Sequence, residues 1–176
     1  MDWQTFAGIE KNKDQRNSLL STNGRLKHVL FSQQMSRATL AQLFDTATAV
    51  RRLNKTDRGG QFLRTTLQDK RVLNLFVQPS TRTVESFMAA AERLGMRARV
   101  IQDLSTSSFA KGESVEDAIR TLSSYFDCLV VRHKEDEFPL KTVWTMLNSQ
   151  REVPVISAGS GASQHVTQSL LDMYTL

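Results

Sequence analysis

The stretch that decides the fold is RVLNLFVQPSTRTVESFMAAAERLG, residues 71–95. Its first part, Arg71 to Val77, is short, apolar and rich in Val, Leu and Phe, which is typical of a buried strand. Its last part, Thr83 to Leu94, has the periodicity of a helix, and Gly95 is a residue type that ends helices. We therefore expect a buried strand that leads into a helix through a polar turn.

The same alternation continues from this stretch to the end of the chain. Further strands are expected at Val100–Ile101, Leu129–Val131 and Val153–Ser157. Further helices are expected at Ser114–Phe126, Leu140–Asn148 and His165–Leu176. Parallel neighbours need a crossover, and that crossover is usually a helix. The βαβαβαβα order therefore predicts an α/β fold, a doubly wound four-stranded parallel sheet with helices on both faces.

The residues before this sheet divide into an arm and the start of the domain. We expect residues 1–27 to form a polar N-terminal arm and residues 28–176 to form one domain. Ser36 begins an amphipathic helix that ends near Asn54, because apolar residues recur after it at helical spacing. A basic loop containing Gly59 and Gly60 follows.

Composition limits the class of protein. A chain of 176 residues with 40% hydrophobic residues can bury the core of one domain. Cys128 is the single cysteine, so no disulfide framework can form within a monomer, and a reducing, cytoplasmic location is favoured. We interpret its side chain as a small buried hydrophobe. The first thirty residues lack the apolar region of a signal peptide, and no apolar run is long enough to cross a bilayer, so no membrane association is expected.

The positive charge is concentrated in one stretch. Between Arg51 and Arg71 there are seven basic and two acidic residues, and 7 − 2 = +5 equals the net charge of the whole chain. We interpret this stretch as a solvated loop and helix end, with a patch for nucleic-acid phosphates as the alternative. Phe62 is its only aromatic residue, so nucleic acid is not the expected partner.

Polar side chains after the first strand indicate an anion site. The turn places Ser80, Thr81, Arg82 and Thr83 at the start of a helix, where free backbone N–H groups and the helix dipole attract negative charge. The hydroxyls add donors, and the guanidinium of Arg82 can bind two phosphate oxygens at once. The alternative is ordinary helix capping by Ser80 or Thr81 with a solvated arginine.

The other predicted strands also end in polar groups. They lead into a serine-rich loop with Lys111, into Arg132-His133, and into a glycine turn, Gly159-Ser160-Gly161, that is followed by His165. Each of these features has an ordinary structural explanation by itself, such as a surface loop or a hydrogen-bonded histidine. Parallel strands, however, bring all four ends to one edge of the sheet, where such folds bind ligands.

Four motifs together resemble a known family. Residues 76–83, FVQPSTRT, resemble the Phe-x-x-x-Ser-Thr-Arg-Thr signature of the aspartate and ornithine carbamoyltransferases. Residues 107–114, SSFAKGES, resemble the loop of the aspartate type, and residues 131–133, VRH, its Arg-His strand end. Residues 165–168, HVTQ, match His-Pro-Thr-Gln at all but one position. The likeness runs from Leu26 to Leu176 and favours the aspartate enzyme over the ornithine enzyme.

The resemblance implies a role for each matched residue. The phosphate of carbamoyl phosphate would be held by Ser80, Thr81, Arg82 and Thr83. The carbamoyl oxygen would be approached by Thr83, Arg132 and His165, and the carbamoyl amide by Gln168. The implied catalytic residues are Arg82, Thr83, Arg132 and His165. Donors held at these oxygens lower the barrier without a metal or a cofactor, so none is expected.

The resemblance also implies an assembly. Ser107 and Lys111 would reach into the active site of a neighbouring subunit of a homotrimer. Regulatory chains or other pathway enzymes are possible further partners.

The implied activity is transfer of the carbamoyl group to the amine of L-aspartate, in pyrimidine biosynthesis. The resemblance implies that the aspartate-binding domain is absent from this chain, so we expect the chain alone to bind carbamoyl phosphate without turnover. Gln78 and Val166 depart from the family pattern, which has glutamate and proline there. A non-catalytic scaffold domain and a carbamoyltransferase for another amine are therefore the alternatives.

Overall fold

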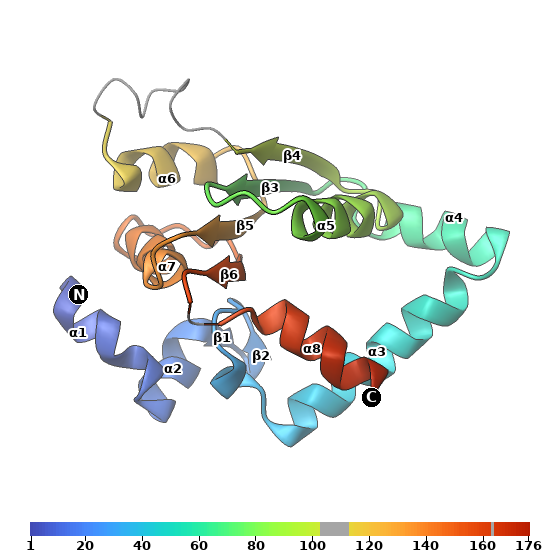
Figure 1. The fold of residues 1–176 in the computed structure, drawn as a ribbon, viewed down its shortest axis with the longest axis horizontal. Coiled ribbons are helices and arrows are strands. Elements are labelled where there is room, and N and C mark those ends of the chain that lie inside the picture. Colours follow the sequence, from blue (N-terminus) through green and yellow to red (C-terminus); the bar gives the residue numbers. More distant parts are fainter. Residues whose placement is uncertain (103–112, 163) are drawn as a thin grey trace.

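The computed structural model of the chain describes residues 1–102, 113–162 and 164–176, and it contains a four-stranded parallel sheet (Figure 1). The strand order is β4-β3-β5-β6. The strands span β3 (Arg71–Phe76), β4 (Arg97–Ile101), β5 (Cys128–His133) and β6 (Val155–Ser160). The predicted parallel α/β sheet is confirmed, since all three strand pairs are parallel.

Each strand leads into a helix, as the sequence predicts. The helices are α5 (Thr81–Arg93), α6 (Val115–Ser123), α7 (Phe138–Asn148) and α8 (Val166–Thr175). Helix α5 begins two residues before the predicted start, and β6 continues through Gly159 and Ser160, which were expected to form a turn. In the described part of the chain, no helix combines the length and the hydrophobicity that crossing a membrane requires.

Helices cover both faces of the sheet because strand side chains alternate between the faces. On β3, Leu73 and Leu75 join the larger core cluster together with α6 and α7. Val72 and Phe76 point the other way and join a second cluster with α5. The predicted doubly wound arrangement is therefore confirmed.

The topology defines where a ligand site should lie. From β3 the chain crosses to β4 on one side, and it later returns to β5 on the other side of β3. The loops after β3 and β5 therefore diverge, and the crevice between them is the usual ligand position in open α/β sheets. The turn before α5 and the end of β5 lie at this crevice.

The basic stretch is helical where a loop was expected. Helix α3 (Arg37–Leu53) is followed by α4 (Asp57–Thr66), which contains Gly59 and Gly60. A side chain at position 59 would overlap the carbonyl of Leu53, so Gly59 permits the close approach of the two helices. The loop prediction was wrong because Gly59 serves helix packing and does not interrupt the helix.

The N-terminal residues differ from the expected polar arm. They form α1 (Trp3–Ala7), a short 3-10 helix η1 (Gly8–Glu10), α2 (Lys13–Leu20) and a hairpin of β1 (Ser21–Thr22) with β2 (Arg25–Leu26). Phe6, Ile9 and Leu20 are fully buried in the larger core cluster, and α1 contacts α7 (Figure 1). Burial of these three side chains, with Trp3 and Leu19 packed against the same cluster, stabilises the docked segment.

A second short 3-10 helix, η2 (Ser32–Gln34), follows the hairpin. Just before it, Val29 pairs with Ile156 and so extends the sheet beyond β6. Helix α8 at the C-terminal end lies beside α3, where Tyr174 contacts Phe44 at 5.6 Å between ring centres. These two helices lie apart from α5 (Figure 1), and the space between them contains the pocket described next.

Candidate functional site

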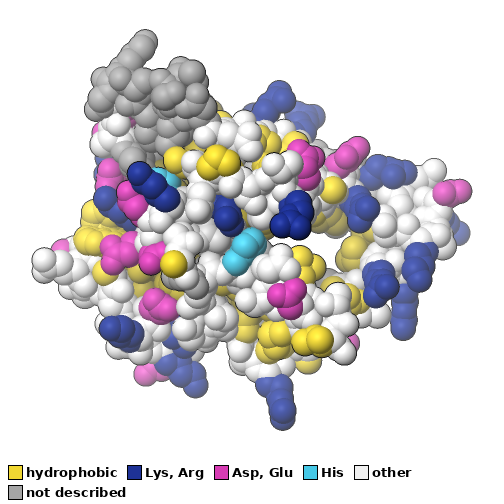
Figure 2. All heavy atoms as spheres, in the orientation of Figure 1, with side chains coloured by type: hydrophobic (Ala, Val, Ile, Leu, Met, Phe, Trp, Pro, Cys, Tyr) yellow, Lys and Arg dark blue, Asp and Glu magenta, His cyan; other side chains and the backbone are white. Residues whose placement is uncertain are grey.

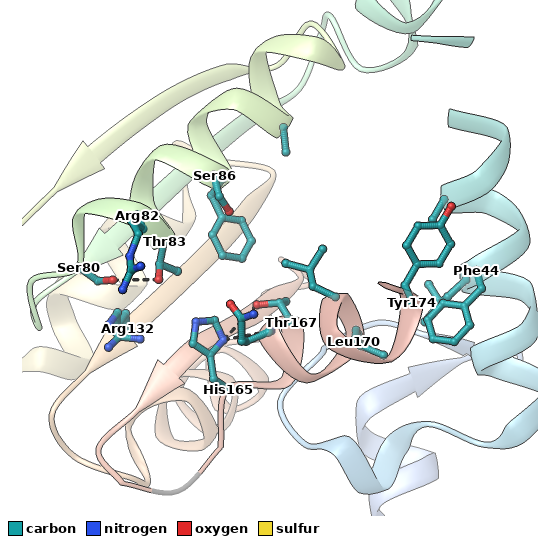
Figure 3. A pocket seen from close by; sticks show the side chains of 16 residues that line it. Phe44, Ser80, Arg82, Thr83, Ser86, Arg132, His165, Thr167, Leu170 and Tyr174 are labelled. Atoms are coloured by element: carbon teal, nitrogen blue, oxygen red, sulfur yellow. Dashed lines mark hydrogen bonds between the residues drawn. The ribbon is translucent and has the colours of Figure 1, made fainter. Parts of the chain in front are cut away.

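A cavity of about 730 Å³ lies between α3, α5 and α8, at the end of β5. Figure 2 shows basic side chains and a histidine beside this hollow. One end of the cavity is polar and is lined by Ser80, Arg82, Thr83, Arg132, His165 and Gln168. The other end is mainly apolar and is lined by Leu43, Phe44, Phe87, Leu170, Leu171 and Tyr174 (Figure 3).

The structure brings six of the nine predicted site residues together in this polar end. Thr81 is the first residue of α5 and is exposed, outside the lining of the cavity. Ser107 and Lys111 lie outside the described residues. The residues that meet come from the ends of β3, β5 and β6, although they are separated by up to about 90 positions in the sequence.

The N-terminus of α5 offers free backbone donors. Ser80 occupies the N-cap position, but its hydroxyl donates to Thr83 Oγ1 at 2.9 Å and does not cap the helix. In contrast, Ser36 and Ser114 accept a backbone N–H at the start of their helices. The first N–H groups of a helix have no partner within it. The uncapped end of α5 is therefore open to an anion, and the alternative of capping by Ser80 does not occur.

Two guanidinium groups add positive charge to this end. Arg82 is exposed on the first turn of α5, and Arg132 is half-buried at the end of β5. Arg132 Nη1 donates to the carbonyl of Ala158 at 2.8 Å, which fixes the side chain against β6. Within residues 1–102, 113–162 and 164–176, no ion pair involves either arginine. Their charge therefore remains available to a ligand.

His165 is held as a neutral donor. Its Nδ1 accepts the backbone N–H of Gln168 at 3.4 Å and lies 3.2 Å from Thr167 Oγ1 (Figure 3). Because Nδ1 acts as the acceptor, the proton of the neutral ring sits on Nε2. Burial, followed by the charge of Arg132, lowers the pKa of His165 below its usual value. At neutral pH the ring therefore presents an Nε2–H donor without a net charge.

Gln168 is also oriented by a neighbour. Its Nε2 donates to Asp172 Oδ1 at 2.8 Å, one helical turn further along α8. This bond uses the amide nitrogen and leaves the carbonyl oxygen of Gln168 as its acceptor.

The two residues of the Arg-His strand end point in opposite directions. His133 faces the other side of the sheet, where its ring stacks on Phe138 at 4.1 Å and its Nδ1 accepts the N–H of Glu135 at 3.1 Å. Successive strand residues alternate between faces, so only Arg132 reaches the cavity.

The arrangement can bind an anion and polarise a carbonyl group. It combines a helix N-terminus, two guanidinium groups and a neutral imidazole donor, and such donors stabilise negative charge on oxygen. Across the described residues, no three or more His, Cys, Asp or Glu side chains form a group that could hold a metal ion.

Several lining residues were missed by sequence reasoning. Ser86 lies one helical turn after Arg82, so helical spacing could have identified it. Gly159 lies next to Arg132 and His165 but does not line the cavity; it has φ of +103° within β6, and only the structure shows why glycine is needed there. The apolar end required knowledge of how α3 and α8 pack, which no local pattern provides.

Comparison with known proteins assigns the site to a family. Residues 27–176 match the model of the aspartate/ornithine carbamoyltransferase carbamoyl-P binding domain. The chain belongs to the aspartate/ornithine carbamoyltransferase family. The match includes all four motifs and all of the residues at the polar end of the cavity. The resemblance noted from the sequence is therefore confirmed.

This chain is similar to aspartate carbamoyltransferases from several organisms. The catalytic subunit from Methanocaldococcus jannaschii is 36% identical over 151 residues, which cover 86% of this chain and 46% of that protein. A crystal structure of the M. jannaschii catalytic subunit has a TM-score of 0.75 at 36% identity, with coverage of 85% and 46%. The chloroplastic enzyme 1 from Pisum sativum is 38% identical, with coverage of 86% and 37%.

A further structure contains both substrates. It is the aspartate transcarbamoylase from Trypanosoma cruzi in complex with carbamoyl phosphate and aspartate, with a TM-score of 0.71 at 36% identity and coverage of 84% of this chain and 46% of that chain. The present chain thus spans about half the length, or less, of the relatives it matches.

Proposed function

We propose that this chain binds carbamoyl phosphate in the polar end of the cavity and forms the carbamoyl-phosphate side of an aspartate carbamoyltransferase. The observation that carries the proposal is the uncapped N-terminus of α5 facing Arg132 and His165 across one cavity. The T. cruzi relative, which binds carbamoyl phosphate and aspartate, supports the choice of substrates.

The phosphate is assigned to the start of α5. Backbone N–H groups of its first turn, the hydroxyls of Ser80, Thr81 and Thr83, and the fork of Arg82 supply donors for several phosphate oxygens. A helix N-terminus with an arginine favours the dianion over a neutral ligand because both the dipole and the guanidinium are positive.

The carbamoyl group is assigned to the opposite wall. The carbamoyl oxygen is approached by Thr83, Arg132 and the Nε2–H of His165. Because the His165 ring is neutral, it can donate this hydrogen bond without attracting the phosphate dianion away from the start of α5. The carbonyl oxygen of Gln168 accepts a hydrogen bond from the carbamoyl NH₂, since its own amide nitrogen is bound to Asp172.

These assignments explain how the reaction would proceed. The amine nitrogen of aspartate attacks the carbamoyl carbon, a C–N bond forms, and the C–O bond to the phosphate breaks. Negative charge develops first on the carbamoyl oxygen, where the donors are, and then on the departing phosphate, which the start of α5 receives. The attacking nitrogen, as a neutral amine, loses one proton in the process, and the departing phosphate accepts it.

The neighbouring subunit is the proposed source of two more groups. Ser107 and Lys111 are assigned to the site of an adjacent copy in a homotrimer, on the strength of the loop resemblance. Light scattering on the purified protein tests this assembly, and a monomer at micromolar concentration would contradict it.

We assign the protein to the cytoplasm because its single cysteine suits a reducing compartment, whereas the pea relative is chloroplastic.

Calorimetric titration with carbamoyl phosphate tests the central proposal. The wild-type chain should bind with a measurable heat, and Arg82→Ala should weaken binding at least tenfold because a charge-assisted bidentate contact is lost. Arg93→Ala is the matched control, since Arg93 lies in the last turn of the same helix. Equal affinities for wild type and Arg82→Ala would instead favour a non-catalytic scaffold.

A further inference from the structure

The first 26 residues lie outside the family match, yet they are docked firmly on the domain. Phe6 and Ile9 are at most 1% exposed. The ring of Trp3 meets that of Trp144 edge-on at 5.8 Å, and Trp144 Nε1 donates to the carbonyl of Met1 at 2.9 Å. Burial of this kind holds a segment in one position, so its polar side chains can act as fixed partners.

One of these polar side chains reaches the turn that carries His165. Gln164, which directly precedes His165, donates from Nε2 to Glu10 Oε1 at 3.2 Å. The same Nε2 contacts Gln33 Oε1 at 3.2 Å, and Gln33 in turn donates to Glu10 Oε1 at 3.5 Å. Glu10 therefore accepts hydrogen bonds from two amide groups.

The other end of the Gln164 amide is equally constrained. Its Oε1 accepts the backbone N–H of Ser32 at 2.9 Å and the Ser32 hydroxyl at 2.7 Å. Because a backbone N–H can only donate, this contact fixes which atom of the amide is oxygen and which is nitrogen. The nitrogen must then face Glu10.

Glu10 is itself held in place. It ends η1, next to fully buried Ile9, and its backbone carbonyl accepts a hydrogen bond from Arg16 Nη1 at 2.5 Å. The path from the docked segment to the turn thus consists of short, direct contacts.

The turn before α8 depends on such contacts. Position 166 is valine, so no proline ring fixes φ at the start of α8. The turn contains Gly161, with φ of +49°, and Gln164 pairs with Ser160 across it. Side-chain contacts at Gln164 therefore restrict the conformations that would otherwise move His165.

We propose that Glu10, acting through Gln164, is a positioning residue for His165, and that residues 1–26 form an intramolecular clamp on the turn that carries it. This inference rests on the proposed function, because it assigns the clamp to the carbamoyl end of that site. The clamp sets the direction of the His165 Nε2–H and leaves the phosphate end, on α5, unaffected.

The two ends of the ligand give a selective test on the whole 176-residue chain. Glu10→Ala and Gln164→Ala should each weaken carbamoyl phosphate binding about threefold to tenfold, the effect of weakening one hydrogen bond between His165 and the carbamoyl oxygen. Inorganic phosphate, which lacks the carbamoyl group, should bind as it does to wild type. Both affinities are measured by calorimetry.

Three further variants sharpen the test. Glu10→Gln keeps an acceptor oxygen and should behave as wild type. Asp14→Ala removes the same charge from the same segment, in the first turn of α2, and should also behave as wild type. The double variant Glu10→Ala with Gln164→Ala should lose no more affinity than Gln164→Ala alone, because Glu10 acts only through the Gln164 side chain.

The His165 ring provides a readout that does not depend on any ligand. Its nitrogen chemical shifts, measured by NMR at pH 7.5, should change in Glu10→Ala and in Gln164→Ala and stay unchanged in Asp14→Ala. Unchanged ring shifts in both alanine variants would overturn the inference, as would equal weakening of phosphate and carbamoyl phosphate. If wild type binds carbamoyl phosphate no better than Arg82→Ala, the proposed function fails, while the ring shifts still decide whether the clamp exists.

Discussion

Arg132 occupies the space that a side chain on Gly159 would fill. A Cβ at position 159 would overlap Arg132 Nη1 and would lie 3.3 Å from His165 Cδ2. Gly159 also has φ of +103°, a conformation that other residues rarely adopt. Arg132 and His165, the two side chains proposed to bind the carbamoyl oxygen, can therefore take these positions only because residue 159 has no Cβ.

Gly159→Ala should damage binding more than folding. The substitution should displace the Arg132 guanidinium and weaken carbamoyl phosphate binding at least tenfold, while backbone strain costs about 1–3 kcal/mol of stability. Calorimetry and urea unfolding measure the two effects. Gly8→Ala is the control, because nothing lies within 4 Å of a Cβ there. If Gly159→Ala binds carbamoyl phosphate within twofold of wild type, the position of Arg132 next to residue 159 is not needed for binding.

Gln168→Ala should separate the two halves of the ligand. Loss of the acceptor for the carbamoyl NH₂ should weaken the binding of carbamoyl phosphate about threefold to tenfold and leave the binding of inorganic phosphate unchanged. Competition between the two ligands in calorimetry checks this. If Gln168→Ala weakens the binding of carbamoyl phosphate and of inorganic phosphate equally, Gln168 supports the structure of the site and does not bind the carbamoyl group.

The stability of the protein should fall in mild acid because of His28. Burial, with the charge of Lys27 as a smaller cause, lowers the pKa of His28 from 6.5 to about 4. Between these values the unfolded chain binds a proton that the folded chain excludes, so stability is complete above pH 6.5 and is lost as the pH falls toward 4. A shift of this size corresponds to about 3 kcal/mol.

Urea unfolding at pH 7, 5.5 and 4.5 measures this loss. His133 and His165 also have lowered pKa values, mainly through burial, and contribute in the same direction. The share of His28 is therefore taken from the difference between wild type and His28→Gln, whose pH dependence should be flatter. Identical pH dependence in the two proteins would rule out His28 as the main contributor.

Cys128 should be unreactive in the folded protein. Burial raises the pKa of its thiol to about 11, so roughly one molecule in a thousand carries the reactive thiolate at pH 8. A chromogenic disulfide reagent should label it slowly in buffer and rapidly in urea. Complete labelling of the folded chain within a minute would contradict the raised pKa of this partly buried thiol.

The sheet and the position of the site could be predicted because their signals are local. Apolar runs such as Arg71–Phe76 and helical spacing from Thr83 onward are visible in short windows. Once the strands are parallel, geometry alone brings Arg82, Arg132 and His165 to one edge.

The remaining features depend on contacts between distant residues. Phe6 packs in the same core as Val155, and Gln164 bonds to Glu10, but neither pairing leaves a pattern in a short window. The uncapped state of Ser80 was also beyond prediction, because its sequence context suits a cap equally well. The contributions of Ser107 and Lys111 stay predictions.

A crystal of the chain soaked with a non-hydrolysable carbamoyl phosphate analogue tests the central claim most directly. The phosphonate should lie at the N-terminus of α5 with Arg82 folded over it, and the carbonyl oxygen should lie within hydrogen-bond distance of Arg132 and His165 Nε2. An empty cavity, or an analogue bound elsewhere with Arg82 extended into solvent, would contradict the account.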